Sequence, residues 1–420
     1  MIIVSIVLVM LALFGAPLFA IIAAGALLSF YQLDPELGPV AVPIEIFGIA
    51  EMPILLAIPL FTFAGYILSE SQAPGRLVRL TQAMLGWMPG GLAIVSIAAC
   101  AFFTAFTGAS GVTIIALGAI LYPALSQAGY DEKFNLGLVT AGGSLGLLFA
   151  PSLPLILYGV VAQVNIDDLF VAGVLPGALM LFSLSFYSLW VNRGNRVPLS
   201  DFSWHEVGSA IVDSIWELPL PIVVLGGIYS GLLAVSEAAA VTAVYVVLIE
   251  VVIRREISIA RLPGIMRESM VLVGGILLIL GASLASTNYV IDAEVPQQLI
   301  ALISNLIDSR ISFLWLLLLF LLVLGAFLDI FSALVLVVPL ILPVAAEFGV
   351  EPVHLGMIFL STMQLGYLTP PVGLNLFIAS YRFDQPIVRV YLATFPFLII
   401  LFITVIVITF VPVLSLGLLR

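Results

Sequence analysis

Residues 364–375 read Gln-Leu-Gly-Tyr-Leu-Thr-Pro-Pro-Val-Gly-Leu-Asn and interrupt an otherwise apolar segment with two adjacent prolines. A regular helix cannot continue through them, because proline lacks an N–H and frees a carbonyl one turn earlier. Residues 142–154 carry a second break and read Gly-Gly-Ser-Leu-Gly-Leu-Leu-Phe-Ala-Pro-Ser-Leu-Pro. The chain therefore contains two discontinuous helices, which we predict over 133–162 and 353–381.

The composition around these breaks is that of a membrane protein. The chain has 420 residues, of which 63% are hydrophobic and 9% are charged, whereas soluble domains carry about 25% charged residues. A membrane span needs about 20 mostly apolar residues, so the chain has material for about ten spans. The net charge is −11 and no basic cluster suits nucleic acid. We therefore predict an all-α integral membrane protein that is surrounded by the lipid bilayer and binds no nucleic acid.

The chain repeats itself at an offset of 220 residues. Five Gly or Pro identities align without a gap, namely Pro123 with Pro343, Gly129 with Gly349, Gly146 with Gly366, Pro151 with Pro371 and Pro176 with Pro396. The composition predicts about half a match over these columns. We therefore divide the chain into a first repeat, 1–200, and a second repeat, 201–420, each with its own scaffold helices.

The number of crossings between the repeats predicts their relative orientation. Each repeat has an apolar block with a small, polar centre, at 91–127 and 311–346. We interpret both blocks as re-entrant helical hairpins, which add no crossing. Five crossings then separate equivalent positions, and an odd number inverts the second repeat. If 216–253 is one broken helix rather than two, the number is even and the repeats are not inverted.

The hairpin tips and the helix breaks together offer ligands for a cation. The first tip reads Thr107-Gly108-Ala109-Ser110-Gly111. In the second, Asp329 is the single charged residue between Arg310 and Glu347. An ionisable residue inside a membrane is a functional candidate by default, although Asp also caps helix N-termini. Freed carbonyls and side-chain oxygens suit a dehydrated Na⁺, and half-helix N-termini suit a carboxylate.

These elements define the candidate site residues. One predicted Na⁺ site combines the first tip with the first break and comprises Thr107, Gly108, Ser110, Gly142 and Ser144. The other combines the second tip with the second break and comprises Asp329, Gly366, Thr369 and Gly373. The predicted substrate-binding residues are Ser110, Ser152 and Asn375.

Enzyme chemistry finds little support in the sequence. It contains no glycine-rich phosphate loop followed by Lys and Ser or Thr, no paired-histidine zinc motif and no Gly-x-Ser-x-Gly. Ser110 lies within Gly-Ala-Ser-Gly and could suggest an intramembrane serine protease, but a credible buried histidine base is lacking. We therefore predict that the chain is not an enzyme, while an intramembrane enzyme or a purely structural subunit remains the alternative from another class.

At these motifs the chain resembles the large permease subunit of tripartite ATP-independent periplasmic (TRAP) transporters. The resemblance is strongest from Phe103 to Pro176 and from Asp329 to Phe377, above all in 369–377, Thr-Pro-Pro-Val-Gly-Leu-Asn-Leu-Phe. The family commonly has Pro-Pro-Ser where this chain has Ala150-Pro151-Ser152, and often Ser-Gly-Ser-Ser at the first tip. Because these departures lie in the first break and the first tip, they change which side chains are available as ligands of the first ion site.

The resemblance implies function, location and partners. It implies an elevator-type, Na⁺-coupled importer of small organic acids in the bacterial inner membrane, with Na⁺ as the coupling ion. It also implies two partners, a periplasmic substrate-binding protein and a small four-helix membrane subunit, here expected as a separate chain. The alternative is a stand-alone Na⁺/dicarboxylate-type symporter of similar architecture that needs no binding protein.

Overall fold

The computed structural model describes residues 7–8, 10–11, 16–33, 38–88, 90–193, 202–304, 307 and 309–419. Within these ranges the regular secondary structure is helical and includes no strand, as predicted. The first repeat contains α2 (Leu18–Leu33), α3 (Gly38–Ala50), η1 (Pro53–Leu56), α4 (Ala57–Glu70), α5 (Ala73–Leu85), α6 (Gly91–Thr107), α7 (Ser110–Ala116), α8 (Gly118–Gln127), α9 (Glu132–Gly142), η2 (Leu145–Leu148), α10 (Leu153–Ala162), α11 (Ile166–Ala172) and α12 (Val174–Asn192). The second contains α13 (Trp204–Asp213), α14 (Pro219–Tyr229), α15 (Val235–Val247), η3 (Leu248–Ile253), α16 (Leu262–Asp292), α17 (Val295–Ser304), α18 (Arg310–Phe327), α19 (Ile330–Glu347), α20 (Pro352–Gly366), α21 (Leu374–Arg382), α22 (Ile387–Phe410) and α23 (Val413–Leu416).

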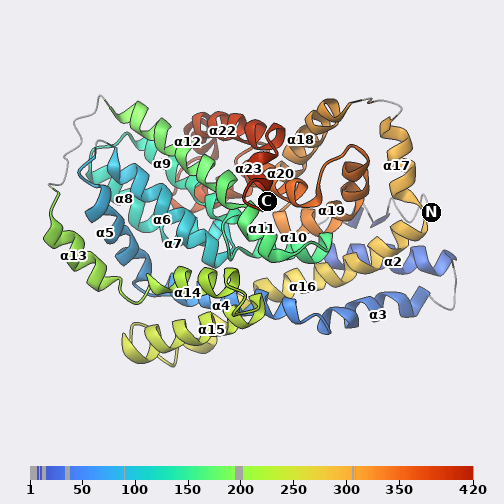
Figure 1. The fold of residues 1–420 in the computed structure, drawn as a ribbon, viewed down its shortest axis with the longest axis horizontal. Coiled ribbons are helices and arrows are strands. Elements are labelled where there is room, and N and C mark those ends of the chain that lie inside the picture. Colours follow the sequence, from blue (N-terminus) through green and yellow to red (C-terminus); the bar gives the residue numbers. More distant parts are fainter. Residues whose placement is uncertain are drawn as a thin grey trace.

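Two layers of helices build the molecule (Figure 1). Helices α2, α3, α4, α14, α15 and α16 lie along one side, and the hairpins and broken helices lie on the other. The amphipathic helices α5 and α13 lie at one end and α17 lies at the other. We call the first layer the scaffold, since its long helices connect to the second layer through α5 and α17.

The helix boundaries repeat at the same offset of 220 residues as the sequence. Helix α6 ends at Thr107 and α18 at Phe327, and the next helices begin at Ser110 and Ile330. Beyond the breaks, α10 begins at Leu153 and α21 at Leu374, which is within one residue of the same offset. The two repeats therefore build the same sequence of elements, a hairpin followed by a discontinuous helix.

The two repeats interlock rather than stand apart. Helix α21 of the second repeat packs on α7 of the first, and α10 of the first packs on α19 of the second. In the scaffold, α15 packs on α4 and α16 packs on α2. Each hairpin is therefore completed by the other repeat's broken helix, so neither repeat buries its own apolar surface alone.

Residues 216–253 form two antiparallel helices rather than one broken helix. The Tyr245 hydroxyl donates to the Trp216 carbonyl oxygen at 2.8 Å. At the other end the chain reverses through Gly231, which has a φ of +71°, and Gly227 lies beside Leu233. This arrangement removes the single-helix interpretation that would have made the number of crossings even.

The predicted segments agree with the structure apart from some boundaries. Both discontinuous helices are confirmed, and the first bends by 43° at its break. The apolar stretch 43–69 is divided between two helices, α3 and α4, because the chain turns at Glu51 and continues through η1. By length and composition, seven described helices could cross a membrane, or up to nine if each bent pair is one span. Both α18 and α19 are among the seven, so re-entry of the second hairpin stays a prediction.

Candidate functional site

The first hairpin tip depends on a glycine. Gly108 has a φ of +64° and ends α6 by donating its N–H to the Thr104 carbonyl oxygen at 2.8 Å. A Cβ at this position would lie 2.4 Å from Leu153 Cγ. Only glycine fits, because the backbone is left-handed and the neighbouring broken helix approaches closely. The tip is thereby held against the start of α10.

Asp329 caps a helix at the second tip. Its Oδ2 accepts hydrogen bonds from the N–H groups of Phe331 and Ser332, both at 3.0 Å. The remaining N–H at this helix start, that of Ile330, donates to the Tyr367 hydroxyl oxygen at 2.6 Å. The helix-capping interpretation of Asp329 is therefore realised in the structure. Its half-buried carboxylate keeps a second oxygen that neither of these bonds uses.

Each hairpin contacts the break of its own repeat through small residues. A Cβ on Gly146 would lie 2.6 Å from the Ala105 nitrogen, and one on Gly366 would lie 2.5 Å from Gly325 Cα. These crossings are equivalent at the 220-residue offset. In the second repeat, the Gly373 N–H also donates to the Ala326 carbonyl oxygen at 3.1 Å. The predicted meeting of tip and break thus occurs in both repeats.

Oxygen atoms gather where the first hairpin meets the first break. Thr104 Oγ1 lies 2.7 Å from Thr113 Oγ1 and 2.8 Å from the carbonyl oxygens of both Cys100 and Gly143. The hydroxyls of Thr104 and Thr113 have two protons between them for these three contacts. At least one oxygen at the junction therefore accepts no hydroxyl proton. Oxygen-rich surroundings of this kind are what a cation such as Na⁺ requires.

Both tips open onto one pocket of about 360 Å³. Its walls come from the two tips, from the broken helices and from the scaffold residues Tyr66 and Leu272. Polar groups are contributed by Ser110, Asp329, Tyr367 and Tyr66. The starts of α7, α19 and α21 all lie in its lining. This pocket unites the tips that the sequence placed 220 residues apart.

Ser110 and Asn375 join the two repeats beside the pocket. The Ser110 hydroxyl donates to Asn375 Oδ1 at 2.7 Å, and both side chains are buried. Asn375 Nδ2 has no hydrogen-bond partner among the described residues, and neither has the buried Ser332 hydroxyl. A buried donor without a partner costs free energy, so Asn375 is suited to donate to a ligand.

Other predicted site residues make local bonds. The Ser152 hydroxyl donates to the Leu147 carbonyl oxygen. Ser152, like Asn375, is not among the residues that line the pocket, but Asn375 is bonded to the lining residue Ser110. The hydroxyls of Ser144 and Thr369, which lie just beyond the ends of α9 and α20, each donate to a carbonyl of the preceding helix, at 3.4 and 3.1 Å. Thr107 Oγ1 lies 3.5 Å from the Ala109 carbonyl oxygen. Gly142 lies beside Cys100, so it borders the oxygen-rich junction.

The site is asymmetric although the fold repeats. At the 220-residue offset, Ser110 corresponds to Ile330 and Asn375 to Leu155. Asp329 corresponds to Ala109, and Tyr367 to Leu147. Thr104, Thr113 and Tyr367 were not among the predicted site residues. The sequence signal that distinguishes them is a polar residue in one repeat aligned with an apolar residue in the other.

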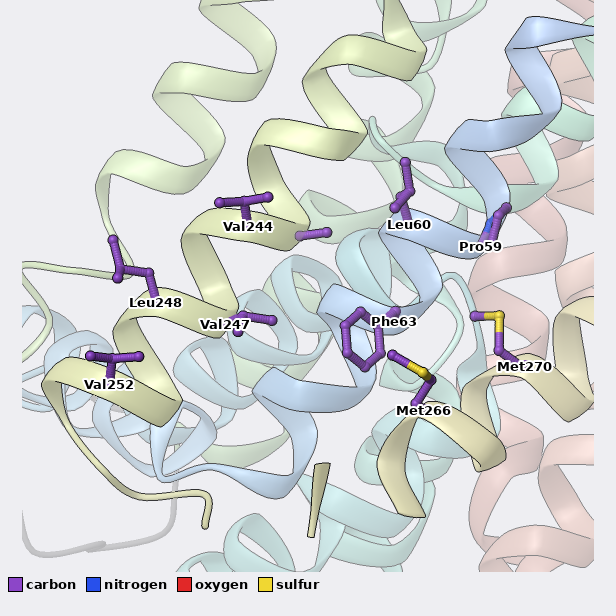
Figure 2. A pocket seen from close by; sticks show the side chains of 10 residues that line it. Pro59, Leu60, Phe63, Val244, Val247, Leu248, Val252, Met266 and Met270 are labelled. Carbon is purple, nitrogen blue, oxygen red and sulfur yellow. The ribbon is translucent and has the colours of Figure 1, made fainter. Parts of the chain in front are cut away.

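A second hollow, of about 530 Å³, lies in the scaffold (Figure 2). Val244, Val247, Leu248 and Val252 lie across from Leu60 and Phe63, and two methionines of α16 complete it. All ten lining side chains are apolar. This hollow offers no group that could orient a carboxylate, so the candidate site is the pocket between the tips.

A solved structure and several characterised proteins resemble the chain. The crystal structure of the YdaH transporter of Alcanivorax borkumensis superposes with a TM-score of 0.58 at 12% identity, covering 88% of this chain and 86% of that one. The C4-dicarboxylate TRAP transporter large permease protein DctM of Pseudomonas aeruginosa is 33% identical over 89% of this chain and 88% of its own. The ectoine/5-hydroxyectoine TRAP transporter large permease protein UehC of Ruegeria pomeroyi is 31% identical over 98% and 96%.

One further relative is longer than this chain. The isethionate TRAP transporter permease protein DctMQ of Oleidesulfovibrio alaskensis is 32% identical over 94% of this chain but only 61% of its own length. The YdaH likeness supports the all-helical fold alone, because the identity is low.

A family profile covers nearly the whole chain. The profile described as "Tripartite ATP-independent periplasmic transporter, DctM component" matches residues 4–414. Its members are permease subunits of bacterial inner-membrane transporters and are not enzymes. The predictions of transporter class, of location and of a non-enzyme are therefore confirmed. The chain belongs to the DctM component family of tripartite ATP-independent periplasmic transporters.

Proposed function

We propose that this chain is the membrane-spanning subunit of a Na⁺-coupled importer of small organic acids, which a periplasmic binding protein delivers. The observation that carries the proposal is the pocket between the two tips. The starts of α7 and α21 lie in its lining, and the first N–H groups of a helix lack intrahelical partners. The N–H groups at the start of α19 are already bonded to Asp329 and Tyr367. Helix starts with free N–H groups favour negatively charged groups. A carboxylate fits there, with Asn375 Nδ2 as an additional donor.

The names of the relatives support organic solutes as substrates. They are named for C4-dicarboxylates, for ectoine and for 2,3-diketo-L-gulonate. The lining of this pocket does not repeat across the two halves, so selectivity among such solutes depends on single residues. We assign Ser110 and Asn375 to substrate binding. Ser152 serves the site indirectly, by holding Leu147 in the pocket wall.

Sodium coupling is supported by the oxygen-rich junction. Thr104, Thr113 and the Gly143 carbonyl converge where the first Na⁺ site was predicted. We propose that they hold one Na⁺ together with oxygens of the first tip. A second Na⁺ is assigned to the free carboxylate oxygen of Asp329 and to carbonyls near Gly366 and Gly373. The close approach of Gly373 to Ala326 keeps these groups together.

Uptake by reconstituted protein tests the proposal. Purified chain in liposomes, combined with the small membrane subunit and candidate binding proteins, should accumulate a labelled organic acid when a Na⁺ gradient points inward. Dissipating the gradient should abolish accumulation, and omitting the binding protein should reduce uptake to background. Robust Na⁺-driven uptake by this chain alone would instead support the stand-alone symporter. Accumulation that persists without a Na⁺ gradient would refute the assigned coupling ion.

A further inference from the structure

A cluster of charged side chains is buried away from the substrate pocket, where α5 meets the scaffold. It comprises Arg76, Glu217, Glu250, Arg254 and Glu256. The side chains of Glu217 and Glu250 are 2% and 1% exposed, and that of Arg76 is 10% exposed. Charges this deeply buried persist only when they are paired and hydrogen-bonded.

Arg76 is the centre of the cluster. Its Nε donates to Glu217 Oε1 at 2.8 Å, and its Nη1 donates to Glu256. Its Nη2 donates to Glu250 Oε1 over a longer distance of 3.3 Å. Arg254 Nη2 lies 3.9 Å from Glu217 Oε2 and also donates to the Asp213 carbonyl oxygen. One guanidinium therefore serves three carboxylates.

The backbone brings two of these carboxylates together. After η3 the chain turns back, and the N–H groups of Glu256 and Ile257 both donate to the Glu250 carbonyl oxygen, at 2.9 and 3.2 Å. The carboxyl groups of Glu250 and Glu256 consequently lie side by side at the two terminal nitrogens of the Arg76 guanidinium. Two adjacent carboxylates repel each other unless a proton lies between them.

Donors are distributed unequally over this pair. Glu256 Oε2 accepts the Gln72 N–H at 2.8 Å, and its Oε1 accepts from Arg76. Burial would raise the pKa of Glu256, but these donors hold it below its usual value. Glu250 has only the long bond to Arg76, and its Oε2 accepts no hydrogen bond from any described residue. Within this pair, Glu250 therefore has fewer hydrogen-bond donors than Glu256.

The formal charges of the cluster also favour one protonated carboxyl group. Two guanidinium groups face three carboxylates, which leaves a buried charge of −1 if all are ionised. The neighbouring pairs Arg79 with Asp213 and Arg261 with Glu70 balance themselves. We propose that Glu250 and Glu256 share one bound proton, which makes this cluster a proton-binding site separate from the substrate pocket.

The bound proton secures one connection between the two layers. Helix α5 leads from the scaffold helix α4 into the first hairpin, and Arg76 ties it to η3 and to the start of α14. In the second repeat the position equivalent to Arg76 is Pro296, so this anchor is specific to the first connection. The Tyr245 hydroxyl, which donates to Trp216, holds α15 and the Glu217 segment together. Losing the proton places two negative charges side by side and weakens the anchor.

Thermal unfolding across pH tests the proposal in purified, full-length protein. A group that binds a proton more tightly when folded contributes less stability as pH rises through its titration. The wild-type melting temperature should therefore fall by a few degrees from mildly acidic to alkaline pH. Glu250→Gln mimics the protonated state and should show a flatter profile. Asp213→Asn is the matched control, since it removes a carboxylate from a neighbouring pair that is exposed and outside the cluster, and it should keep the wild-type slope.

Infrared spectroscopy supplies an independent measurement. The wild-type protein at neutral pH should show a carboxylic-acid C=O stretching band that shifts in D₂O and is missing from Glu250→Gln. Asp213→Asn should retain it. A wild-type spectrum without such a band would overturn the proposal, as would a Glu250→Gln variant that keeps the wild-type pH profile. Neither measurement depends on transport.

Discussion

At the residue scale, the carboxylate of Asp329 has two roles. One oxygen caps α19 through the N–H groups of Phe331 and Ser332, and the other is assigned to Na⁺. Asn caps helices about as well as Asp. We therefore expect Asp329→Asn to keep protein yield and melting temperature near wild type. Because the charge is lost, the Na⁺ concentration for half-maximal uptake should rise about tenfold, roughly 1.4 kcal/mol.

Uptake measured against Na⁺ concentration separates the two roles of Asp329. An unchanged Na⁺ curve for Asp329→Asn would reduce the residue to a helix cap and remove it from the ion site. Asp329→Ala is a useful companion, because it loses the cap as well. Its melting temperature should fall, because loss of the cap lowers the free energy of unfolding by about 0.5–2 kcal/mol.

Gly366 is a second position where a single residue decides the structure. A Cβ there would lie 2.5 Å from Gly325 Cα, and the backbone cannot move aside cheaply. We expect Gly366→Ala to destabilise the protein by about 1–3 kcal/mol, as overpacking does, and to impair uptake. Gly274→Ala is the matched control, since a Cβ at Gly274 meets nothing within 4 Å. Equal melting temperatures for the two variants would contradict the close crossing of α18 and α20.

At the scale of elements, the contact between α7 and α21 joins the two repeats at the pocket. Ser110→Ala removes the bond to Asn375 Oδ1, which leaves that buried amide with less hydrogen bonding. We expect a loss of about 1–3 kcal/mol, since a buried polar group becomes unsatisfied. If the pair also binds substrate, the KM for uptake should rise more than the stability loss alone explains.

Ser230→Ala serves as the control for Ser110→Ala. Ser230 is exposed and its hydroxyl donates only to a carbonyl of its own turn, at 3.2 Å. Uptake kinetics and melting temperature should both stay near wild type. A Ser110→Ala variant that behaves like Ser230→Ala would show that the α7–α21 hydrogen bond has no part in substrate binding.

At the scale of the whole molecule, the inverted arrangement of the repeats is open to direct measurement. Both tips line one pocket, so accessibility at the tips cannot distinguish the two orientations. The opposite ends of the hairpins can. Gln127 and Glu347 are equivalent at the 220-residue offset and both are exposed. We expect single cysteines at these positions, in a Cys100→Ser background, to react with a membrane-impermeant reagent from opposite sides of the membrane.

Labelling in inside-out and right-side-out vesicles provides the comparison. Because Cys100 is buried and is the single cysteine in the chain, its replacement leaves a low background. Reaction of both introduced cysteines from the same side would exclude inversion. The fold would then be a parallel repeat, although the paired breaks and the pocket would stand.

Much of the architecture follows from the sequence alone, for local physical reasons. Lipid solvation requires apolar helices, and adjacent prolines must interrupt them, so the helical class and both broken helices could be predicted. The repeat was visible because Gly146 and Gly366 occupy crossings where no Cβ fits. The site residues Ser110, Asn375 and Asp329 lie at or beside the pocket for the same reason, since each marks a helix start or a break.

Other features arise only from tertiary packing. Nothing local shows that α21 lies on α7 or that α10 lies on α19, because these contacts cross the repeats. The oxygen-rich junction at Thr104 also escapes a sequence pattern, since Gly143 reaches it from 39 residues away. Arg76 and its three carboxylates come from three separate segments. A sequence sets which residues can bury charge or break a helix, and only the three-dimensional fold sets which of them meet.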